Sequence, residues 1–326
     1  PYLSDYLYRD STVGRDRTAF GATVDYRLGR ADRVSLSFHY GTFHSFYNQR
    51  NFTYSVGAVA AGNFSPAFTR GNVGAGEIRQ AESPRDRLSR TVMPSLSYRH
   101  DGPVWKAEAG LGFSLATNRF RDIDKGYFGS LLARRTGVTV SFEDNTDLRP
   151  GRVTVTDGVT GAPVDPGTLA NYALATAGSS LGKSVSFHRT AFVNARRDFA
   201  WRWPVGLKAG LDARESRSDY RTNNTALTYV GADGRSSTTP TGTSDDTAAG
   251  VVDYDIAQRF GPYGFPKMQW VSPESLYALY QAKPNYFTAD QNAQYRSLIS
   301  NSKRSVELIS SAYLRGDLRL FDGRLK

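Results

Sequence analysis

Apolar and polar residues alternate along several stretches of this chain. From Phe20 to Leu28 every second residue is apolar, and the residues between them are Gly, Thr, Asp and Arg. After a short turn at residues 29–32, the alternation resumes and continues from Val34 to Tyr40. A period of two is the pattern of a strand with one apolar side and one wet side. The two segments therefore predict a β-hairpin with an apolar face and a polar face.

This unit recurs farther along the chain. Further alternating strands are expected at residues 91–99, 105–114, 187–199, 205–214 and 308–320. Short turns are expected at residues 100–103, 200–204 and 321–324. The hairpins are joined to one another by long loops, expected at about residues 44–88, 116–185 and 217–305. Loops of this length are uncommon in compact soluble domains.

Short turns on one side and long loops on the other are typical of outer-membrane β-barrels. Alternation alone would also fit a soluble β-sandwich, but a sandwich core needs bulky side chains, whereas fluid acyl chains can pack against small ones. The expected apolar face holds many alanines, namely Ala22, Ala107, Ala109, Ala209, Ala213 and Ala312. Aromatic residues gather at the hairpin ends, where a membrane interface would lie: Tyr26, Tyr98, Trp105, Phe199, Trp201, Trp203 and Phe321.

We therefore expect an all-β chain. Residues 1–326 would form a partial antiparallel transmembrane β-barrel, with about seven or eight strands of a larger barrel and long extracellular loops. The periplasmic turns would lie near Asp32, Gly102, Trp203 and Gly323. Such a fragment would have two open edges, so we expect the isolated chain to aggregate rather than insert into a membrane.

The last long loop has the signals of short helices. Ser272 can cap a helix N-terminus, Pro273 suits its first position, and the apolar residues that follow are spaced as on one helical face before Pro284 ends the pattern. A second helical stretch is predicted from Thr288 to Ile299, with Asp290 near its start.

Composition and charge exclude several classes of function. The chain has 19 Tyr and 18 Phe but no Cys, which excludes disulfides and thiolate sites. Its net charge of +10 comes from basic residues interleaved with acids, as in Arg15-Asp16-Arg17 and Arg85-Asp86-Arg87. That interleaving indicates a solvated surface, so we expect no nucleic-acid partner. No apolar run reaches the length of a transmembrane helix. The chain opens at Pro1 without a signal peptide, as expected of a segment cut from a longer protein.

Catalytic and metal-binding patterns are missing from the sequence. The four histidines are dispersed, and no nucleophile, zinc or phosphate-loop motif occurs. Residues 144–147 offer oxygen ligands for calcium but lack the glycine and distal glutamate of a calcium loop. We expect no enzyme, no metal and no cofactor.

Two segments near the end resemble a known family. Residues 268–273, 276–280 and 285–287 resemble the late extracellular loop of TonB-dependent outer-membrane receptors, and residues 311–326 resemble the barrel strand and turn that follow it. The resemblance implies a barrel with a plug domain in its lumen, located in the outer membrane and driven by the TonB complex. Its partners would be outer-membrane lipid, the plug of the same parent chain, the TonB complex through an N-terminal region, and a small-molecule or glycan substrate. Nothing in these residues looks like the plug or the C-terminal strands.

Candidate site residues fall into two groups. Charged residues on the expected polar face would line the lumen, and we favour an acid–base ladder contacting the plug over substrate contact: Asp25, Arg27, Lys106, Glu108, Lys208, Asp212, Arg214, Arg315, Asp317 and Arg319. Aromatic and basic residues at the expected external mouth are the better substrate candidates: Tyr47, Arg50, Arg121, Tyr220, Arg221, Trp270 and Tyr286.

Three functions remain open on the sequence. The first is the barrel portion of a transporter for energy-coupled uptake of a scarce nutrient, of the siderophore, vitamin or saccharide class. The second is a passive porin-like barrel, which would not require a helical late loop. The third is a secreted soluble β-protein that binds glycans.

Overall fold

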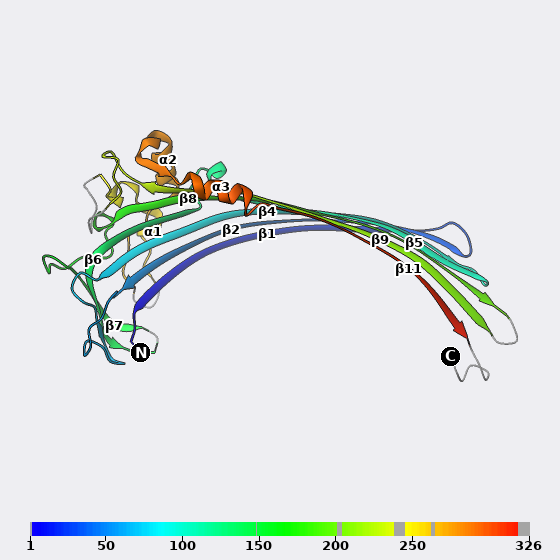
Figure 1. Cartoon of the computed structure of the whole chain (residues 1–326), viewed down its shortest axis with the longest axis horizontal. Coiled ribbons are helices and arrows are strands. Elements are labelled where there is room, and N and C mark those ends of the chain that lie inside the picture. The colour runs from blue at the N-terminus through cyan, green and yellow to red at the C-terminus, as the bar shows by residue number, and fades with distance from the viewer. Residues whose placement is uncertain (1, 148, 201–203, 238–244, 262–264, 319–326) are drawn as a thin grey trace.

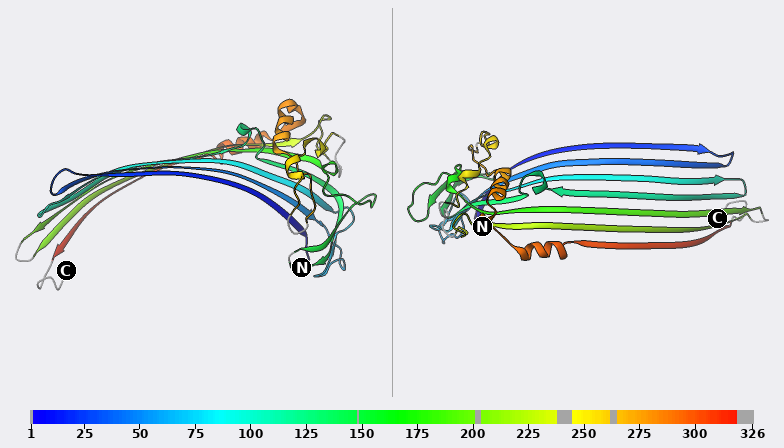
Figure 2. Two further views of the ribbon diagram at one scale, coloured as in Figure 1. Left: turned by 180° about the vertical axis from the view of Figure 1, so that it is seen from behind. Right: turned by 90° about the horizontal axis from the view of Figure 1, so that it is seen from above.

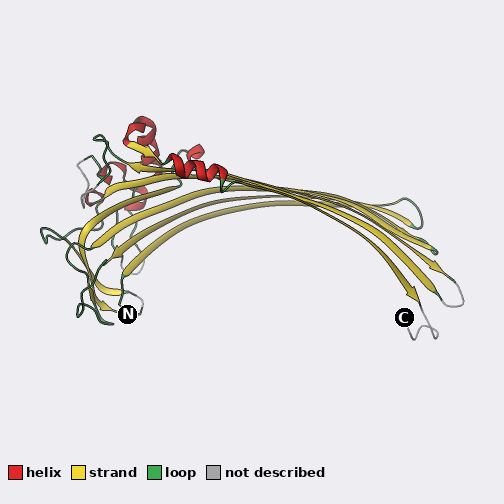
Figure 3. Cartoon of the chain, viewed as in Figure 1, coloured by secondary structure: helices red, strands yellow, loops and turns green. Residues whose placement is uncertain are grey.

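The computed structural model describes residues 2–147, 149–200, 204–237, 245–261 and 265–318. Strands hold 63% of the described residues and helices 12%, which confirms the all-β class (Figure 3). No helix in the described part of the chain is long and apolar enough to span a bilayer.

Seven long strands form one antiparallel sheet that arches along the strand direction (Figure 1). They run side by side in the order β1–β2–β4–β5–β8–β9–β11 when seen from above (Figure 2). Their bounds are β1 (Asp5–Arg27), β2 (Asp32–Ser55), β4 (Gly76–Asp101), β5 (Trp105–Arg121), β8 (Ala173–Phe199), β9 (Val205–Tyr229) and β11 (Lys303–Leu318).

The short turns and the long links lie at opposite ends of the sheet, which we call the turn end and the loop end. The turn end joins β1 to β2, β4 to β5 and β8 to β9, and the loop end carries the three longer links and all the helices (Figure 1). The expected turn positions Trp203 and Gly323 lie outside the described residues.

The expected loop bounds are wrong, because the strands run farther than the alternation does. Chain outside the seven strands covers residues 56–75, 122–172 and 230–302 at the loop end, not 44–88, 116–185 and 217–305. The β2–β4 pairing continues without a break from Asp32↔His100 to Ser55↔Glu77. Beyond Phe46 both sides of β2 are at least partly covered, so burial there no longer selects apolar residues at alternate positions only.

Cross-strand rows define the two sides of the sheet, because directly paired residues of an antiparallel sheet point the same way. One row is apolar across all seven strands and contains Tyr26, Val34, Tyr98, Ala109, Val193, Leu211 and Ala312. The neighbouring row contains Asp25, Ser35, Ser97, Gly110, Phe192, Asp212 and Ser311. We call the two sides of the sheet, along its full length, the apolar face and the polar face.

Two glycines on the polar face make room for aromatic rings from the next strand. A Cβ at Gly110 would overlap the ring of Phe192, its direct partner on β8, and a Cβ at Gly210 would overlap the ring of Tyr313 on β11. The rings lie over the bare backbone and fill space that the glycines leave open.

Short strands complete the sheet at the loop end. They are β3 (Thr69–Arg70), β6 (Ser130–Asn145), β7 (Pro150–Asp157) and β10 (Phe287–Ala289). Where β5 ends, β6 takes its place and pairs with β4 on one side and β8 on the other. The second half of β6 turns away to pair with β7 and β3.

The predicted helices in the last loop are confirmed. α2 (Pro273–Ala282) begins after Ser272, whose hydroxyl accepts a hydrogen bond from the Ser275 N–H at 3.1 Å. α3 (Gln291–Ile299) begins after Asp290 rather than at Thr288, because residues 287–289 form β10. The other helical turns in the described ranges are α1 (Tyr254–Ala257) and the 3-10 segments Ile123–Lys125, Leu169–Asn171, Ala248–Val251 and Pro284–Tyr286.

α3 covers the edge of β9 before β11 begins. The hydroxyl of Ser297 accepts a hydrogen bond from the backbone N–H of Asn224 at 2.9 Å, and the hydroxyl of Ser302 accepts one from the N–H of Thr222 at 3.2 Å. These bonds satisfy edge groups that would otherwise be open to another strand.

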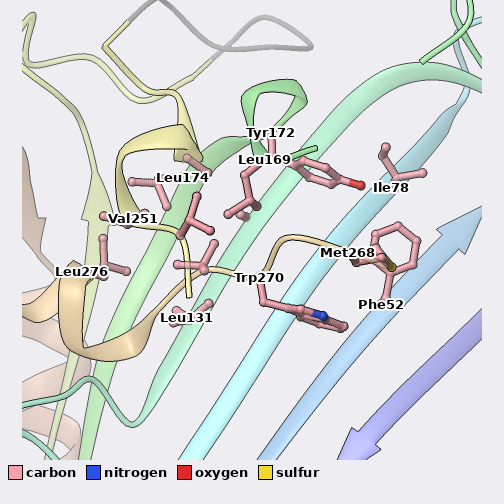
Figure 4. Packing of buried hydrophobic residues seen from close by; sticks show 14 of the residues in the cluster. Phe52, Ile78, Leu131, Leu169, Tyr172, Leu174, Val251, Met268, Trp270 and Leu276 are labelled. Atoms are coloured by element: carbon pink, nitrogen blue, oxygen red, sulfur yellow. The ribbon is translucent and has the colours of Figure 1, made fainter. Parts of the chain in front are cut away.

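A hydrophobic core joins the loops to the loop-end halves of the strands (Figure 4). Phe52 and Ile78 extend from β2 and β4 on the apolar face and are fully buried beneath residues of the last loop, among them Trp270 and Met268. The ring of Trp270 meets that of Phe52 edge-on, with centroids 6.5 Å apart. The apolar face is therefore covered by protein at the loop end and bare toward the turn end.

Candidate functional site

The residues predicted to line a lumen share one side of the sheet. Nine of the ten lie on the polar face, and Arg319 lies outside the described residues. Some ion pairs cross between strands, as expected of a ladder: Lys208 Nζ lies 3.8 Å from Glu108 Oε1, and Arg196 Nη1 lies 3.2 Å from Asp317 Oδ2. Around them a shallow cavity of about 290 Å³ opens on the polar face.

The residues predicted at an external mouth are not brought together. Tyr47 and Tyr220 lie on the polar face, whereas Arg50, Arg121 and Arg221 lie on the opposite one. The physical reason is the period of two: residues one apart on a strand point to opposite sides. The prediction grouped these residues by their distance from the turns, and it therefore combined residues of the polar face with residues of the apolar face.

Two of these mouth residues belong to the interior of the loop end. Trp270 is 4% exposed and sits in the hydrophobic core, so it cannot offer its ring to a ligand from solution. The Arg50 side chain is buried between two carboxyl groups, with Nε 2.9 Å from Glu82 Oε1 and Nη2 3.4 Å from Asp253 Oδ2. Tyr286 is half-buried against Tyr229, with ring centroids 6.4 Å apart.

Glu82 is the most deeply buried carboxyl near this group. It is 1% exposed, and Asn48 Nδ2 donates a hydrogen bond to its Oε1 at 2.6 Å. Burial raises the pKa of Glu82 to about 8, while the neighbouring Arg50 guanidinium opposes that rise. A cavity of about 570 Å³ adjoins the group and is bordered by Arg50, Asp253 and Glu274.

A different cluster, which the sequence analysis missed, lies on the polar face beyond the alternating segments. We call it the arginine–phenylalanine cluster, and it consists of Arg15, Arg17, Phe43, Arg85, Arg87 and Phe120 from β1, β2, β4 and β5. Cross-strand pairs Arg17↔Phe43 and Arg87↔Phe120 place cations and rings in contact.

Three of the four guanidinium groups of this cluster lie over the rings. Arg17 and Arg87 lie 5.1 and 5.6 Å from the centroid of Phe43, and Arg85 and Arg87 lie 5.3 and 5.7 Å from that of Phe120. These distances are within the range of a cation–π interaction. The stacking holds these three arginine side chains in place while leaving N–H donors available.

No carboxylate in the described part of the chain forms an ion pair with any of these four arginines. All four are on exposed positions flanked by Tyr47 and Asn118, and Arg87 Nε donates to Asn118 Oδ1 at 2.9 Å. Four uncompensated cations on rigid strands create a local positive potential that suits an anionic ligand, and planar guanidinium groups suit carboxylates and phosphates in particular.

The signal for this cluster was present in the sequence. Each of the segments Arg15-Asp16-Arg17 and Arg85-Asp86-Arg87 alternates in charge. On a strand the arginines therefore share the polar face, while the aspartates point to the opposite face, where Asp86 Oδ2 lies 2.7 Å from His44 Nε2. Taken as mixed-sign charge, the segments look nearly balanced. On a strand, however, one face carries only the arginines and the other only the aspartate.

Comparisons with known proteins add no assignment. Neither the protein-family models, nor the curated proteins, nor the solved structures gave a significant match to this chain. Among the described residues, no group of three or more His, Asp or Glu side chains is placed to hold a metal ion.

Proposed function

We propose that this chain forms part of the wall of an outer-membrane β-barrel, with its apolar face against lipid and its polar face toward the lumen. One observation carries the proposal: toward the turn end the apolar face stays bare across all seven long strands. Leu211 is 60% exposed and Leu314 is 79% exposed, and contiguous apolar surfaces of this extent are typical of a membrane or a large partner.

The height of the bare apolar face fits a membrane. On β5 it runs from Trp105 through alternate positions to Leu115. Ten residue steps span roughly 34 Å along a strand, or about 24 Å when the strand is tilted by 45°, which is close to the apolar band of outer-membrane barrels.

The particular barrel we propose is an energy-coupled transporter of the TonB-dependent receptor type. Support comes from the resemblance of residues 268–273 and 311–326 to that family, and from the capped helices of the last loop, which a plain porin does not require. The arginine–phenylalanine cluster would contact an anionic small-molecule substrate from the polar face.

Alternating cysteine accessibility tests the membrane proposal, and residues 1–326 contribute no natural cysteine to the labelling. Leu211→Cys and Asp212→Cys would be introduced separately into the protein, expressed from its complete reading frame in a Gram-negative host. In isolated membranes, a water-soluble maleimide should label Asp212→Cys and reach Leu211→Cys only after detergent is added. Recovery of the protein in the soluble extracellular fraction, with equal labelling at both positions, would instead support a secreted glycan-binding protein.

The transporter type has its own test. Planar-bilayer conductance of the whole protein should be low, because a plug closes the lumen, and the reading frame upstream of this chain should encode a plug-like domain. A steadily open pore would favour the passive porin.

A further inference from the structure

Beyond the bare apolar face, three cations form one row across neighbouring strands. Arg119 of β5 pairs directly with Lys183 of β8, which pairs directly with Arg221 of β9. The row lies on the apolar face, and directly paired side chains in adjacent strands lie about 5 Å apart at Cβ. The three positive charges are therefore presented together on the side of the sheet that we propose faces lipid.

A second row of the same face adds two more cations. Arg90 on β4 and Arg304 on β11 lie in a row that also contains Asp219. We call Arg90, Arg119, Lys183, Arg221 and Arg304 the basic belt. Two carboxylates offset it: Asp124 Oδ2 lies 2.6 Å from Arg119 Nη2, and Asp219 Oδ1 lies 2.5 Å from Arg221 Nε. The belt keeps a net positive charge.

Lys183 is the central cation of the first row. It is exposed, and no carboxylate in the described ranges lies within ion-pair distance of its ammonium group. It stands between Arg119 and Arg221, so an anion at this point would meet three cations at once.

The position of the belt relative to the apolar face fits a lipid headgroup. On β5, Arg119 is four residues beyond Leu115, the last apolar position of the bare face. Four residues span roughly 13 Å along the strand and about 9 Å along the membrane normal at a 45° tilt. Headgroups extend roughly 5–8 Å beyond the hydrocarbon boundary, so the Arg119 backbone lies at the outer edge of the headgroup layer.

The surface at the belt is also hollowed. A cavity of about 510 Å³ is bordered by the three cations of the first row together with Leu181 and the α3 residue Leu298. Cations beside apolar side chains suit a ligand that combines a phosphate with hydrocarbon.

We propose that the basic belt binds the phosphate groups of outer-leaflet lipids and fixes the depth and tilt of this part of the barrel in the membrane. The proposal rests on the proposed membrane function. Each cation near an anionic membrane surface strengthens association by about five-fold, so three together give a substantial preference for anionic over zwitterionic lipid.

Lipid retention measures that preference. The detergent-solubilised protein is offered an equal mixture of phosphatidylglycerol and phosphatidylcholine, and the lipid that co-elutes with it is quantified by mass spectrometry. The test variant is R119Q/K183Q/R221Q. The matched control is R27Q/R33Q/R99Q, which removes another row of three directly paired cations, on the polar face at the turn end. Both variants lose the same charge, so general electrostatic attraction falls equally in each.

We expect the wild type and the control to retain phosphatidylglycerol preferentially and the belt variant to lose roughly ten-fold or more of that preference. Lys183→Gln alone should lose about five-fold, and it removes no ion pair that holds the fold. An equal loss in both triple variants, or no loss in either, would overturn the belt. So would full displacement of lipid by inorganic phosphate, which would indicate a site for free phosphate.

The belt and the membrane proposal fail differently. Retention of both lipids without preference refutes the belt and leaves the barrel wall intact. Retention of neither lipid, with the protein recovered in the soluble fraction, refutes both.

Discussion

A single arginine placed on one side or the other of β4 tests which side meets lipid. Leu96 and Ser97 are adjacent and both exposed, but Leu96 lies in a row with Leu36 and Leu111 on the apolar face, and Ser97 lies on the polar face. Leu96→Arg and Ser97→Arg add the same charge to the same strand, so they differ only in the medium that the side chain enters.

The size of the expected loss of stability follows from the depth of Leu96 in the membrane. Leu96 is five residues from Asp101, the end of β4 at the turns. That places it roughly 17 Å along the strand and about 12 Å along the membrane normal, near the middle of a 25 Å apolar band. Arginine at the midplane of a barrel's lipid face costs about 2–4 kcal/mol, whereas an exposed site in water usually changes stability by less than about 0.5 kcal/mol.

The assay is reversible denaturant unfolding of the protein in phosphatidylcholine bilayers, followed by tryptophan fluorescence. We expect Leu96→Arg to lower the folding equilibrium constant by roughly thirty- to nine-hundred-fold and Ser97→Arg to leave it nearly unchanged. Equal small effects would show that both faces meet water and would refute the lipid assignment. A larger penalty for Ser97→Arg would mean that the faces are assigned the wrong way round.

Three further outcomes are expected. Gly110→Val should lower stability by about 1–3 kcal/mol in the same assay, because its side chain would overlap the ring of Phe192, whereas Gly14→Val, which has open space around its Cβ, should be tolerated. Burial raises the pKa of the Glu82 carboxyl to about 8, so its contribution to stability is complete below the ordinary glutamate pKa and is lost as pH rises through 8. The thermal stability of the loop end should therefore decrease as pH rises toward 8, and Glu82→Gln should flatten that pH dependence; an unchanged slope would count against it. Within the described chain β1 pairs only with β2 and β11 only with β9, so residues 1–326 alone should aggregate, and a monomeric, heat-modifiable species on gel electrophoresis would contradict this.

Local pattern was enough to identify much of the sheet. The alternation from Phe20 to Leu28 and from Val34 to Tyr40 predicts a hairpin, and β1 and β2 pair across both segments. The helices of the last loop could also be predicted, because the side chains of Ser272 and Asp290 cap them. Each accepts a hydrogen bond from the backbone N–H of the residue three positions later. These features depend on residues that are close together in the sequence, so they can be predicted from the sequence alone.

The proposed binding surfaces, in contrast, depend on the tertiary structure. Arg17 and Arg87 both contact the ring of Phe43 because β2 pairs with β4 after an excursion of some twenty residues. No local rule sets the register of that pairing. Trp270 was expected at an external mouth and is instead in the core, because the last loop folds back onto β2. Alternation determines which residues share a side of one strand, whereas only the pairing of distant strands and the return of the loops determine which of them meet.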